Sequence, residues 1–411
     1  MCMLKKITFL IFFVITIAQT QLSVAQITYN SEIGVLDSLH SAVLNESRKI
    51  YVQLPDGYNP DSSYKYPVAY ILDGEHHLNA LNTVHSYYSG GFMPEMILVG
   101  ISNDTNRNRD LTTSIVDDPW IKESGGADTF IKFIEQELIP YVESIYPVTN
   151  YRTLIGHSYG GLFTINTLMY HSQLFENYIA IDPSLDWDDQ KLVKQSKELM
   201  AGEKFKNKAL FMSLDGQLHP SDKSITIDNV VKDTTGATFS PRSNIAFAEL
   251  IKANPANGLT FEWKFYPNDL HGTIPLPSIM DGLLGLFTWY QMENTDKINS
   301  PDTSLEELSQ IIKNRERKLQ SHFGYMEAPY PEDLLNMSGY MNMDMQQMDK
   351  AKMYFEFCVE YYPESANAYD SLADYYVSQK DFKNALINVT KAYELSGDAY
   401  HKKRMEEFMG K

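Results

Sequence analysis

The chain has 411 residues, of which 43% are apolar and 12% aromatic, so it is long enough for two domains and a sizeable core. It carries 53 acidic against 35 basic residues, which gives a formal charge of −18 at pH 7. This excess of negative charge argues against nucleic acid or an anionic membrane surface as a partner. The composition therefore indicates an acidic globular protein.

The first 25 residues have the form of a cleaved secretory signal peptide. Lys5 and Lys6 precede an apolar run over residues 7–18, and residues 23–25 place small side chains at the two positions that a signal peptidase reads. We expect cleavage after Ala25, which makes the protein exported, periplasmic or secreted, without membrane attachment afterwards. An uncleaved anchor is the alternative, although a run of about a dozen apolar residues is short for a bilayer.

Short β-rich apolar runs alternate with stretches of helical period from Gln26 to Gln291. This alternation predicts an α/β sheet with crossover helices and seven or eight strands. Two of the runs, 66–72 and 96–101, are almost continuously apolar, which predicts central strands buried on both faces. The predicted strands are 48–54, 66–72, 96–101, an apolar run just before Gly156, 178–181, 209–214 and 259–266.

Ser158 lies at the centre of a Gly-x-Ser-x-Gly motif, with Gly156 and Gly160 on either side. An apolar strand pattern precedes the motif, and apolar residues at helical spacing follow it from Leu162 to Met169. A glycine-flanked serine between a strand and a helix is typical of a nucleophile elbow, in which a strained turn exposes the serine. A chance match is the alternative, but it would rarely have this context. We therefore predict that Ser158 is a catalytic nucleophile.

Serine is a poor nucleophile near neutral pH and needs a base, usually a histidine oriented by a carboxylate. In α/β-hydrolases the histidine comes last in the chain, in a loop after the final strand. His271 has that place, five residues after the strand predicted to end at Tyr266, and Gly272 beside it leaves room for the ring. His219, in a polar loop, is the weaker candidate.

The acid that orients the histidine is expected directly after the strand 209–214. Asp215 is the first candidate and Asp222, in the same loop, is its competitor. Asp215 followed by Gly216 is equally typical of a plain turn. A Ser-His pair supported by a backbone carbonyl is the third possibility.

An acyl-transfer site also needs two amide donors that stabilise the oxyanion of the tetrahedral intermediate. The N–H of Tyr159, directly after the serine, is expected to be one donor. The other is expected from Gly74 or Glu75, in the loop after the strand 66–72.

Four further residues are candidates for binding the substrate. Arg107 and Arg109 follow the strand 96–101, where either could hold an anionic or oxygen-rich group, although a loop arginine is more often an ion-pair partner. Trp120 and Trp187 occupy loops expected at the same edge of the sheet, where they would wall the pocket or pack locally.

The part of the chain after the sheet is predicted to be helical. Residues 294–303 are polar and contain proline, so we expect a first domain over 26–293 and a linker with a connecting helix over 294–331. Residues 332–411 repeat at a period of 34, the tetratricopeptide period, with matched pairs such as Ala351 and Ala385. We predict two tetratricopeptide-like repeats and a closing helix, with a generic pair of helical hairpins as the alternative.

Several motifs together resemble the putative esterase family, which includes esterase D, the enterochelin esterases and the feruloyl and acetyl-xylan esterases. The resemblance spans roughly residues 33–290. It implies an α/β-hydrolase fold and serine-dependent cleavage of carboxylic esters, with Ser158 and His271 at the family's nucleophile and base positions. The chain departs from the family over 217–242, where the acid belongs, and at Asp182 and Asp186. The motifs are Leu44–Arg48, Tyr66–Gly74, Val99–Ile101, Arg107–Asp110, Leu138–Tyr141, Gly156–Leu162 and Asp182–Leu185.

These observations predict an α/β-hydrolase sandwich with a mostly parallel central sheet, followed by a small all-α tetratricopeptide-like domain. The predicted function is that of an exported serine esterase acting on siderophore or acyl-carbohydrate esters, and a related acyl-transfer or peptidase chemistry is the second enzyme hypothesis. The alternative is a scaffold that binds a protein through its tetratricopeptide region while its hydrolase part is catalytically dispensable. No metal-ligand spacing and no phosphate-binding or dinucleotide motif is present, so no cofactor or metal is expected.

Overall fold

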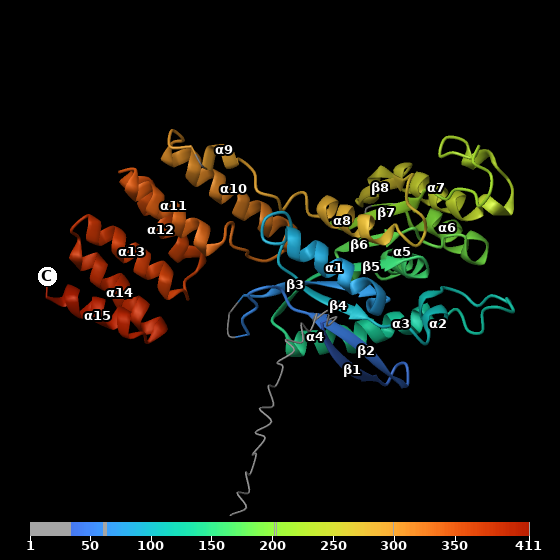
Figure 1. The fold of residues 1–411 in the computed structure, drawn as a ribbon, viewed down its shortest axis with the longest axis horizontal. Coiled ribbons are helices and arrows are strands. Elements are labelled where there is room, and N and C mark those ends of the chain that lie inside the picture. Colours follow the sequence, from blue (N-terminus) through green and yellow to red (C-terminus); the bar gives the residue numbers. More distant parts are fainter. Residues whose placement is uncertain (1–33, 61–63, 201, 203, 299, 411) are drawn as a thin grey trace, which may run out of the picture. The chain divides into compact units, whose positions relative to one another are not determined.

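The central feature of the fold is an eight-stranded sheet (Figure 1). The structure is a computed structural model that describes residues 34–410, apart from 61–63, 201, 203 and 299. The predicted signal peptide over residues 1–25 lies outside the described residues. The strands are β1 (Val35–Ser41), β2 (Glu46–Gln53), β3 (Tyr66–Leu72), β4 (Ile97–Ile101), β5 (Val148–His157), β6 (Asn177–Ile181), β7 (Ala209–Asp215) and β8 (Thr260–Tyr266).

The strand order is β1-β2-β4-β3-β5-β6-β7-β8, and β3 to β8 run parallel. Strand β2 pairs antiparallel with β4, and β1 pairs antiparallel with β2 at the edge. Every residue of β3 and β4 is buried, which confirms the prediction that these apolar runs are central strands. The sheet is therefore mostly parallel, and its carboxyl-terminal edge collects the loops that follow β3, β5, β6, β7 and β8.

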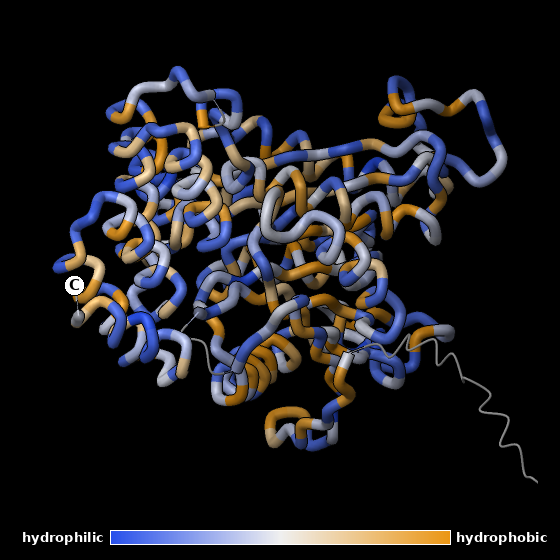
Figure 2. Tube along the Cα trace, turned by 60° about the vertical axis from the view of Figure 1, so that its left-hand side comes forward, coloured by the Kyte–Doolittle hydropathy of each residue, from blue (hydrophilic) through white to orange (hydrophobic). Residues whose placement is uncertain are grey.

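Successive residues of each strand point to opposite faces of the sheet. Because both faces carry apolar side chains, helices cover both. Tyr70 of β3 packs in one buried cluster with Phe130 and Phe163, whereas its neighbour Ile71 packs in the other with Leu78. Figure 2 shows hydrophobic and hydrophilic residues alternating along the chain. The helices are α1 (Gly74–Tyr88), α2 (Arg107–Leu111), α3 (Ala127–Phe133) continued by a π-helical turn (Ile134–Leu138) into α4 (Ile139–Ile145), α5 (Tyr159–Tyr170), α6 (Trp187–Leu199), α7 (Phe239–Lys252) and α8 (Pro275–Leu286). Helix α5 is the most buried of them, since all residues from Gly160 to Met169 are buried.

The chain after the sheet is helical, as predicted, and forms successive hairpins (Figure 1). Ser304 caps the first long helix by accepting a hydrogen bond from the N–H of Glu307. Ala351 and Ala385, 34 residues apart, are both fully buried, so small residues recur where helices meet. The tetratricopeptide assignment itself stays a prediction. The helices are α9 (Thr295–Ile298), α10 (Leu305–Phe323), α11 (Glu332–Asp344), α12 (Met348–Tyr361), α13 (Ala366–Ser378), α14 (Phe382–Ser396) and α15 (Ala399–Met409).

Within the described residues, no helix has both the length and the apolar composition that a membrane crossing requires.

Candidate active site

The predicted nucleophile, Ser158, lies in a sharp turn between β5 and α5 with φ 61° and ψ −117°. A Cβ atom on Gly156 would lie 2.2 Å from the carbonyl oxygen of Gly160, so the turn can close only if position 156 has no side chain. A Cβ atom on Gly161 would lie 2.8 Å from Pro183 in the loop after β6. The glycines of the motif therefore allow the strand, the helix and a neighbouring loop to meet around Ser158.

The predicted base, His271, lies in the loop after β8, next to this turn. Its ring centroid is 4.5 Å from that of His157, the residue before Ser158. The hydrogen bond recorded for Ser158 Oγ joins it to Ser184 Oγ, 3.3 Å away, rather than to His271. The structure thus brings His271 to the elbow, and apo hydrogen bonds of this kind often form only when the substrate binds.

The partner of His271 is Asp182, which directly follows β6. Asp182 Oδ2 lies 2.5 Å from His271 Nδ1, and Asp182 Oδ1 lies 3.4 Å from the Nδ2 of the fully buried Asn244. The backbone N–H of Asp182 donates to the carbonyl oxygen of Ser213 at 3.2 Å. Asp182 is therefore held by β7 and α7 while it faces the histidine.

Neither of the two aspartates predicted as the acid is hydrogen-bonded to His271. Asp215 ends β7, is 6% exposed, and accepts a hydrogen bond from the N–H of Gln217 at 3.1 Å. Its carboxylate, that of Asp182 and the His271 ring offer atoms within 4.8 Å of one another, so Asp215 is a neighbour of the pair rather than the recorded partner of the histidine. Asp222 is exposed and accepts hydrogen bonds from Ser224, so its carboxylate caps its own turn.

The charges of this cluster are coupled. The hydrogen bond that Asp182 accepts from His271, together with the negative charge of Asp182, raises the pKa of His271, although burial opposes that rise. Burial and the negative charge of Asp182 raise the pKa of Asp215 to about 6. The three side chains offer one potential metal-ligand atom each, and the Nδ1 of His271 is engaged by Asp182. In this arrangement Asp182 supports a protonated ring more directly than Asp215.

The elements predicted to bind the oxyanion meet at one place. Tyr159 opens α5 and Gly74 opens α1, and the strands before them, β5 and β3, are paired in parallel register. The first N–H groups of a helix lack partners within the helix and carry its positive partial charge. Glu75 lies in the same first turn of α1, and both of its carboxylate oxygens are buried without a recorded hydrogen-bond partner. Two helix N-termini therefore lie side by side next to Ser158.

Arg107 joins these two elements, whereas Arg109 does not reach them. The Nε of Arg107 donates to both carboxylate oxygens of Asp73 at 2.9 and 3.0 Å, and its Nη2 donates to the carbonyl oxygen of His157 at 3.2 Å. Arg109 instead pairs with Glu46 and Asp110. Arg109 is therefore an ion-pair partner, which is the more common role of an arginine in a loop.

The two tryptophan candidates also differ. Trp187 is 8% exposed, donates its Nε1–H to the carbonyl oxygen of Ser114 at 3.2 Å, and packs edge-on against Tyr159 with centroids 5.2 Å apart. Trp120 is 90% exposed. Trp187 therefore supports the residue beside Ser158, and Trp120 stands on the surface.

Three residues near the site were not predicted for it: Asp182, Ser184 and Asn244. One signal could have found Asp182, because it follows the short predicted strand 178–181. Side chains that follow neighbouring parallel strands meet at the same edge of the sheet. Asn244 lies within a helix and carries no comparable signal.

The close contact between Gly156 and Gly160 gives a stability prediction. We expect Gly156→Ala to lower the free energy of unfolding by about 1–3 kcal/mol or more, the loss typical of overpacked or strained positions. The reason is that the new Cβ atom would meet backbone atoms of Gly160, which cannot move aside. Gly272→Ala is the matched control, since a Cβ there meets nothing within 4 Å. Urea denaturation of both variants measures the difference, and equal midpoints would contradict the steric account of the elbow.

Known proteins resemble this chain in sequence and in structure. The putative esterase family matches residues 41–270. The ferri-bacillibactin esterase BesA of Bacillus subtilis is 30% identical over 208 residues, which are 45% of this chain and 71% of BesA. The siderophore enterobactin esterase of Emericella nidulans is 30% identical over 182 residues, which are 41% of this chain and 58% of that protein.

Among solved structures, an IroE-like serine hydrolase from Shewanella oneidensis is 28% identical with a TM-score of 0.64, and the match covers 79% of this chain and 99% of that one. An uncharacterised protein from Capnocytophaga ochracea is 18% identical with a TM-score of 0.59, and the match covers 92% of this chain and 99% of that one, which shows a shared fold alone. The family match covers more than half of the 411 residues and spans both Ser158 and Asp182. The chain therefore belongs to the putative esterase family.

Proposed function

We propose that this protein is an exported serine esterase in which Ser158 is the nucleophile, His271 the base and Asp182 the acid that orients it. The observation that carries the proposal is the contact of His271 Nδ1 with the buried Asp182, on a ring that lies beside the elbow. This contact directs the other ring nitrogen, Nε2, away from Asp182. Sequence reasoning favoured Asp215 or Asp222 as the acid, and the geometry of the cluster favours Asp182 instead.

The proposed reaction proceeds through an acyl-enzyme. His271 Nε2 takes the proton of Ser158 as Oγ attacks the ester carbonyl, and the N–H groups at Tyr159 and at Gly74 or Glu75 stabilise the oxyanion. The protonated ring is stabilised by Asp182, and it gives its proton to the departing alcohol as the C–O bond breaks. A water molecule then attacks the acyl-enzyme with the same base, which releases the acid and restores Ser158.

The substrate class proposed is a siderophore ester. The relatives reported above are named esterases of ferri-bacillibactin and enterobactin, and Arg107, with one guanidinium edge on Asp73, is 32% exposed beside the elbow. An acyl-carbohydrate ester is the second candidate, and a related acyl-transfer or peptidase activity is the third. Turnover of a triscatechol siderophore, a feruloyl sugar, an aryl acetate and a short peptide by the purified protein would rank them.

The organisation of the chain completes the proposal. We propose a signal peptide over residues 1–25, an esterase domain over 26–293, a connecting segment over 294–331 and two tetratricopeptide-like repeats with a closing helix over 332–411. The repeats would offer a surface for a protein partner. Amino-terminal sequencing of the protein recovered outside the cytoplasm tests the leader, and recovery of a chain that begins at Met1 would contradict it. A scaffold without catalysis is not favoured, because the family is one of esterases.

A fluorophosphonate probe tests the nucleophile. We expect the folded protein to be labelled covalently on Ser158, because a serine with a neighbouring base attacks phosphorus as it attacks a carbonyl. Peptide mass spectrometry locates the adduct, and Ser158→Ala should abolish both labelling and ester hydrolysis. Ser184→Ala is the control, because its hydroxyl lies 3.3 Å from that of Ser158. Labelling of Ser184 in place of Ser158 would overturn the assignment.

Three single substitutions identify the acid. We expect Asp182→Asn to lower kcat by a factor of about 10³–10⁴, the range for loss of a carboxylate that orients a catalytic histidine. Asp215→Asn should cost about tenfold or less, since its contribution to His271 is electrostatic and indirect. Asp222→Asn, on an exposed carboxylate, should leave kcat unchanged. A larger loss in Asp215→Asn than in Asp182→Asn would return the acid role to Asp215.

The pH profile gives an independent prediction. Asp182 raises the pKa of His271, so the ring stays protonated, and inactive as a base, up to a higher pH than an isolated histidine. The kcat/KM of the protein should therefore fall as pH decreases through a pKa above 6.5. In Asp182→Asn the acid limb of the residual activity should move to lower pH. An unmoved limb would mean that Asp182 does not act on the base.

A further inference from the structure

A cavity of about 1200 Å³ lies at the amino-terminal edge of the sheet, away from the candidate active site. It is lined by Tyr66 and Val148, the first residues of β3 and β5, whereas Ser158 follows the last residue of β5. A strand rises about 3.3 Å per residue, so β5 separates the cavity from Ser158 by roughly 30 Å. The cavity is therefore distinct from the ester site, and its residues belong to one compact unit, 33–411.

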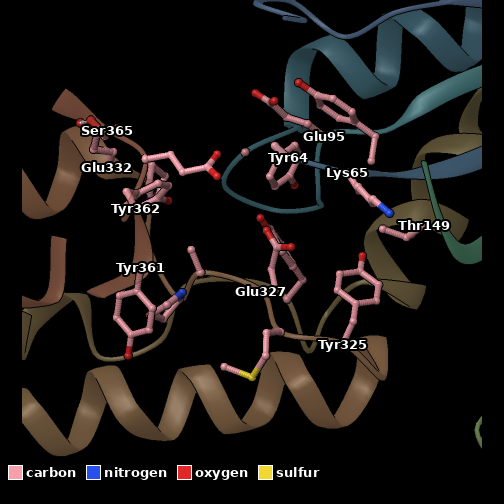
Figure 3. Close-up of a pocket in the computed structure, with 18 of the residues that line it drawn as sticks. Tyr64, Lys65, Glu95, Thr149, Tyr325, Glu327, Glu332, Tyr361, Tyr362 and Ser365 are labelled. Carbon is pink, nitrogen blue, oxygen red and sulfur yellow. Dashed lines mark hydrogen bonds between the residues drawn. The ribbon is translucent and has the colours of Figure 1, made fainter. Parts of the chain in front are cut away.

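Four glutamates from distant parts of the sequence line the cavity, and Figure 3 shows three of them, Glu95, Glu327 and Glu332, on its different sides. Glu95 precedes β4, Glu327 follows α10, Glu332 begins α11, and Glu364 precedes α13. Glu332 is already bonded, because it accepts hydrogen bonds from Ser365 Oγ at 2.6 Å and Asn367 Nδ2 at 2.9 Å. Glu95 and Glu327 line the cavity together with Tyr64, whose pKa is raised by burial and, to a smaller extent, by the negative charges of these two carboxylates.

Glu327 is the central group of the cavity, and its charge is poorly compensated. Burial raises the pKa of Glu327 to about 7, and a hydrogen bond from Tyr64 opposes that rise. Burial also raises the pKa of Glu95. Both carboxylates are only partly exposed to solvent, and a carboxylate partly withdrawn from water without a cationic partner is less favourable, so a bound cation would stabilise it.

Two basic side chains line the cavity, but neither is paired with Glu327. Arg315 is 7% exposed and donates its N–H groups to backbone carbonyl oxygens, those of Pro329 at 2.6 Å, Gln291 at 3.1 Å and Tyr290 at 2.8 Å. Lys65 is exposed. The guanidinium of Arg315 is therefore committed to the backbone and to the rings of Tyr290 and Tyr330, 5.3 and 5.4 Å from their centroids. Four carboxylates outnumber two basic groups in the lining.

Tyrosine rings form much of the remaining wall: Tyr64, Tyr66, Tyr290, Tyr325, Tyr361 and Tyr362. Arg315 already lies over the ring of Tyr290 and Lys313 over that of Tyr361, so a ligand would contact the other four. The face of an aromatic ring attracts a cation, and a phenol oxygen accepts a hydrogen bond from it. An anionic ligand such as a catecholate would be repelled by the carboxylates, and a small divalent cation would prefer converging oxygens to rings. Rings and carboxylates together fit an ammonium group on a carbon chain.

We propose that this cavity binds an organic cation, a primary ammonium carried by a linear oligoamine or by the lysine side chain of a peptide, with Glu327 and Glu95 accepting its N–H groups between the tyrosine rings. Glu95 precedes β4 of the sheet, whereas Glu327 lies in the segment between α10 and α11. The cation would therefore join the sheet to the helical part of the chain. This inference does not depend on the proposed esterase function.

Isothermal titration of the full-length protein with spermidine and with the tripeptide Gly-Lys-Gly tests the proposal. We expect saturable binding of at least one probe, weakened by about tenfold or more in Glu327→Gln, since a hydrogen bond to a charged group is worth about that factor. Glu406→Gln, on the exposed face of α15, should bind as the unmodified protein does. Ser158→Ala should also bind normally, which separates this cavity from the ester site.

The two probes distinguish the sources of the ammonium. Binding of spermidine alone indicates a free oligoamine, and tighter binding of the tripeptide indicates a peptide side chain. Circular dichroism checks that each variant folds. If Glu327→Gln does not fold, Glu95→Gln is the second variant that tests the proposal. The proposal is overturned if neither probe binds saturably, if neither variant that folds weakens binding, or if succinate binds as tightly as spermidine.

Discussion

The arrangement of the candidate site depends on one strained residue, Ser158. Its positive φ is unfavourable for every residue type except glycine, because a Cβ atom clashes with the backbone. Such a conformation costs about 1–3 kcal/mol and persists only when its surroundings hold it. The N–H of Ser158 donates to Ile181 at 3.0 Å, and its carbonyl oxygen accepts from Leu162 at 3.0 Å and Ser184 at 3.1 Å. Ile181 and Ser184 flank Asp182, so the bonds that fix the proposed nucleophile also fix the proposed acid.

The second constraint is electrostatic. Asp182 and Asp215 lie near the same histidine. A negative charge on one carboxylate disfavours ionisation of a partly buried carboxyl group beside it. Asp182 has the better partners, because His271 and the amide of Asn244 both face it, whereas Asp215 has the N–H of Gln217. Burial and the negative charge of Asp182 together raise the pKa of Asp215 to about 6.

Much of the fold could be predicted because apolar runs and glycine motifs report local structure directly. The buried strands β3 and β4 and the turn at Ser158 follow from their own residues. The edge strand β1 was missed, since its exposed side chains give no apolar run. The acid could not be resolved, because the ends of β6 and β7 meet at one edge and both carry an aspartate. Arg109 pairs with Glu46, which is 63 positions away and therefore invisible to spacing arguments.

The two sites occupy opposite ends of the same strands, and this placement limits how they can influence each other. Coupling between distant sites requires an element with two alternative arrangements that both ligands bias. Strands β3 and β5 pair in parallel from Val68 to Ile71 after an irregularity between Tyr66 and Val68, and β3 is buried along its whole length. A sliding strand would expose apolar side chains on both faces, so β3 offers no second arrangement. A cation in the cavity would instead act on the segment of Glu327, which carries no residue of the candidate active site. It would link the helical part of the chain to the sheet, and the geometry at Ser158 would stay unchanged.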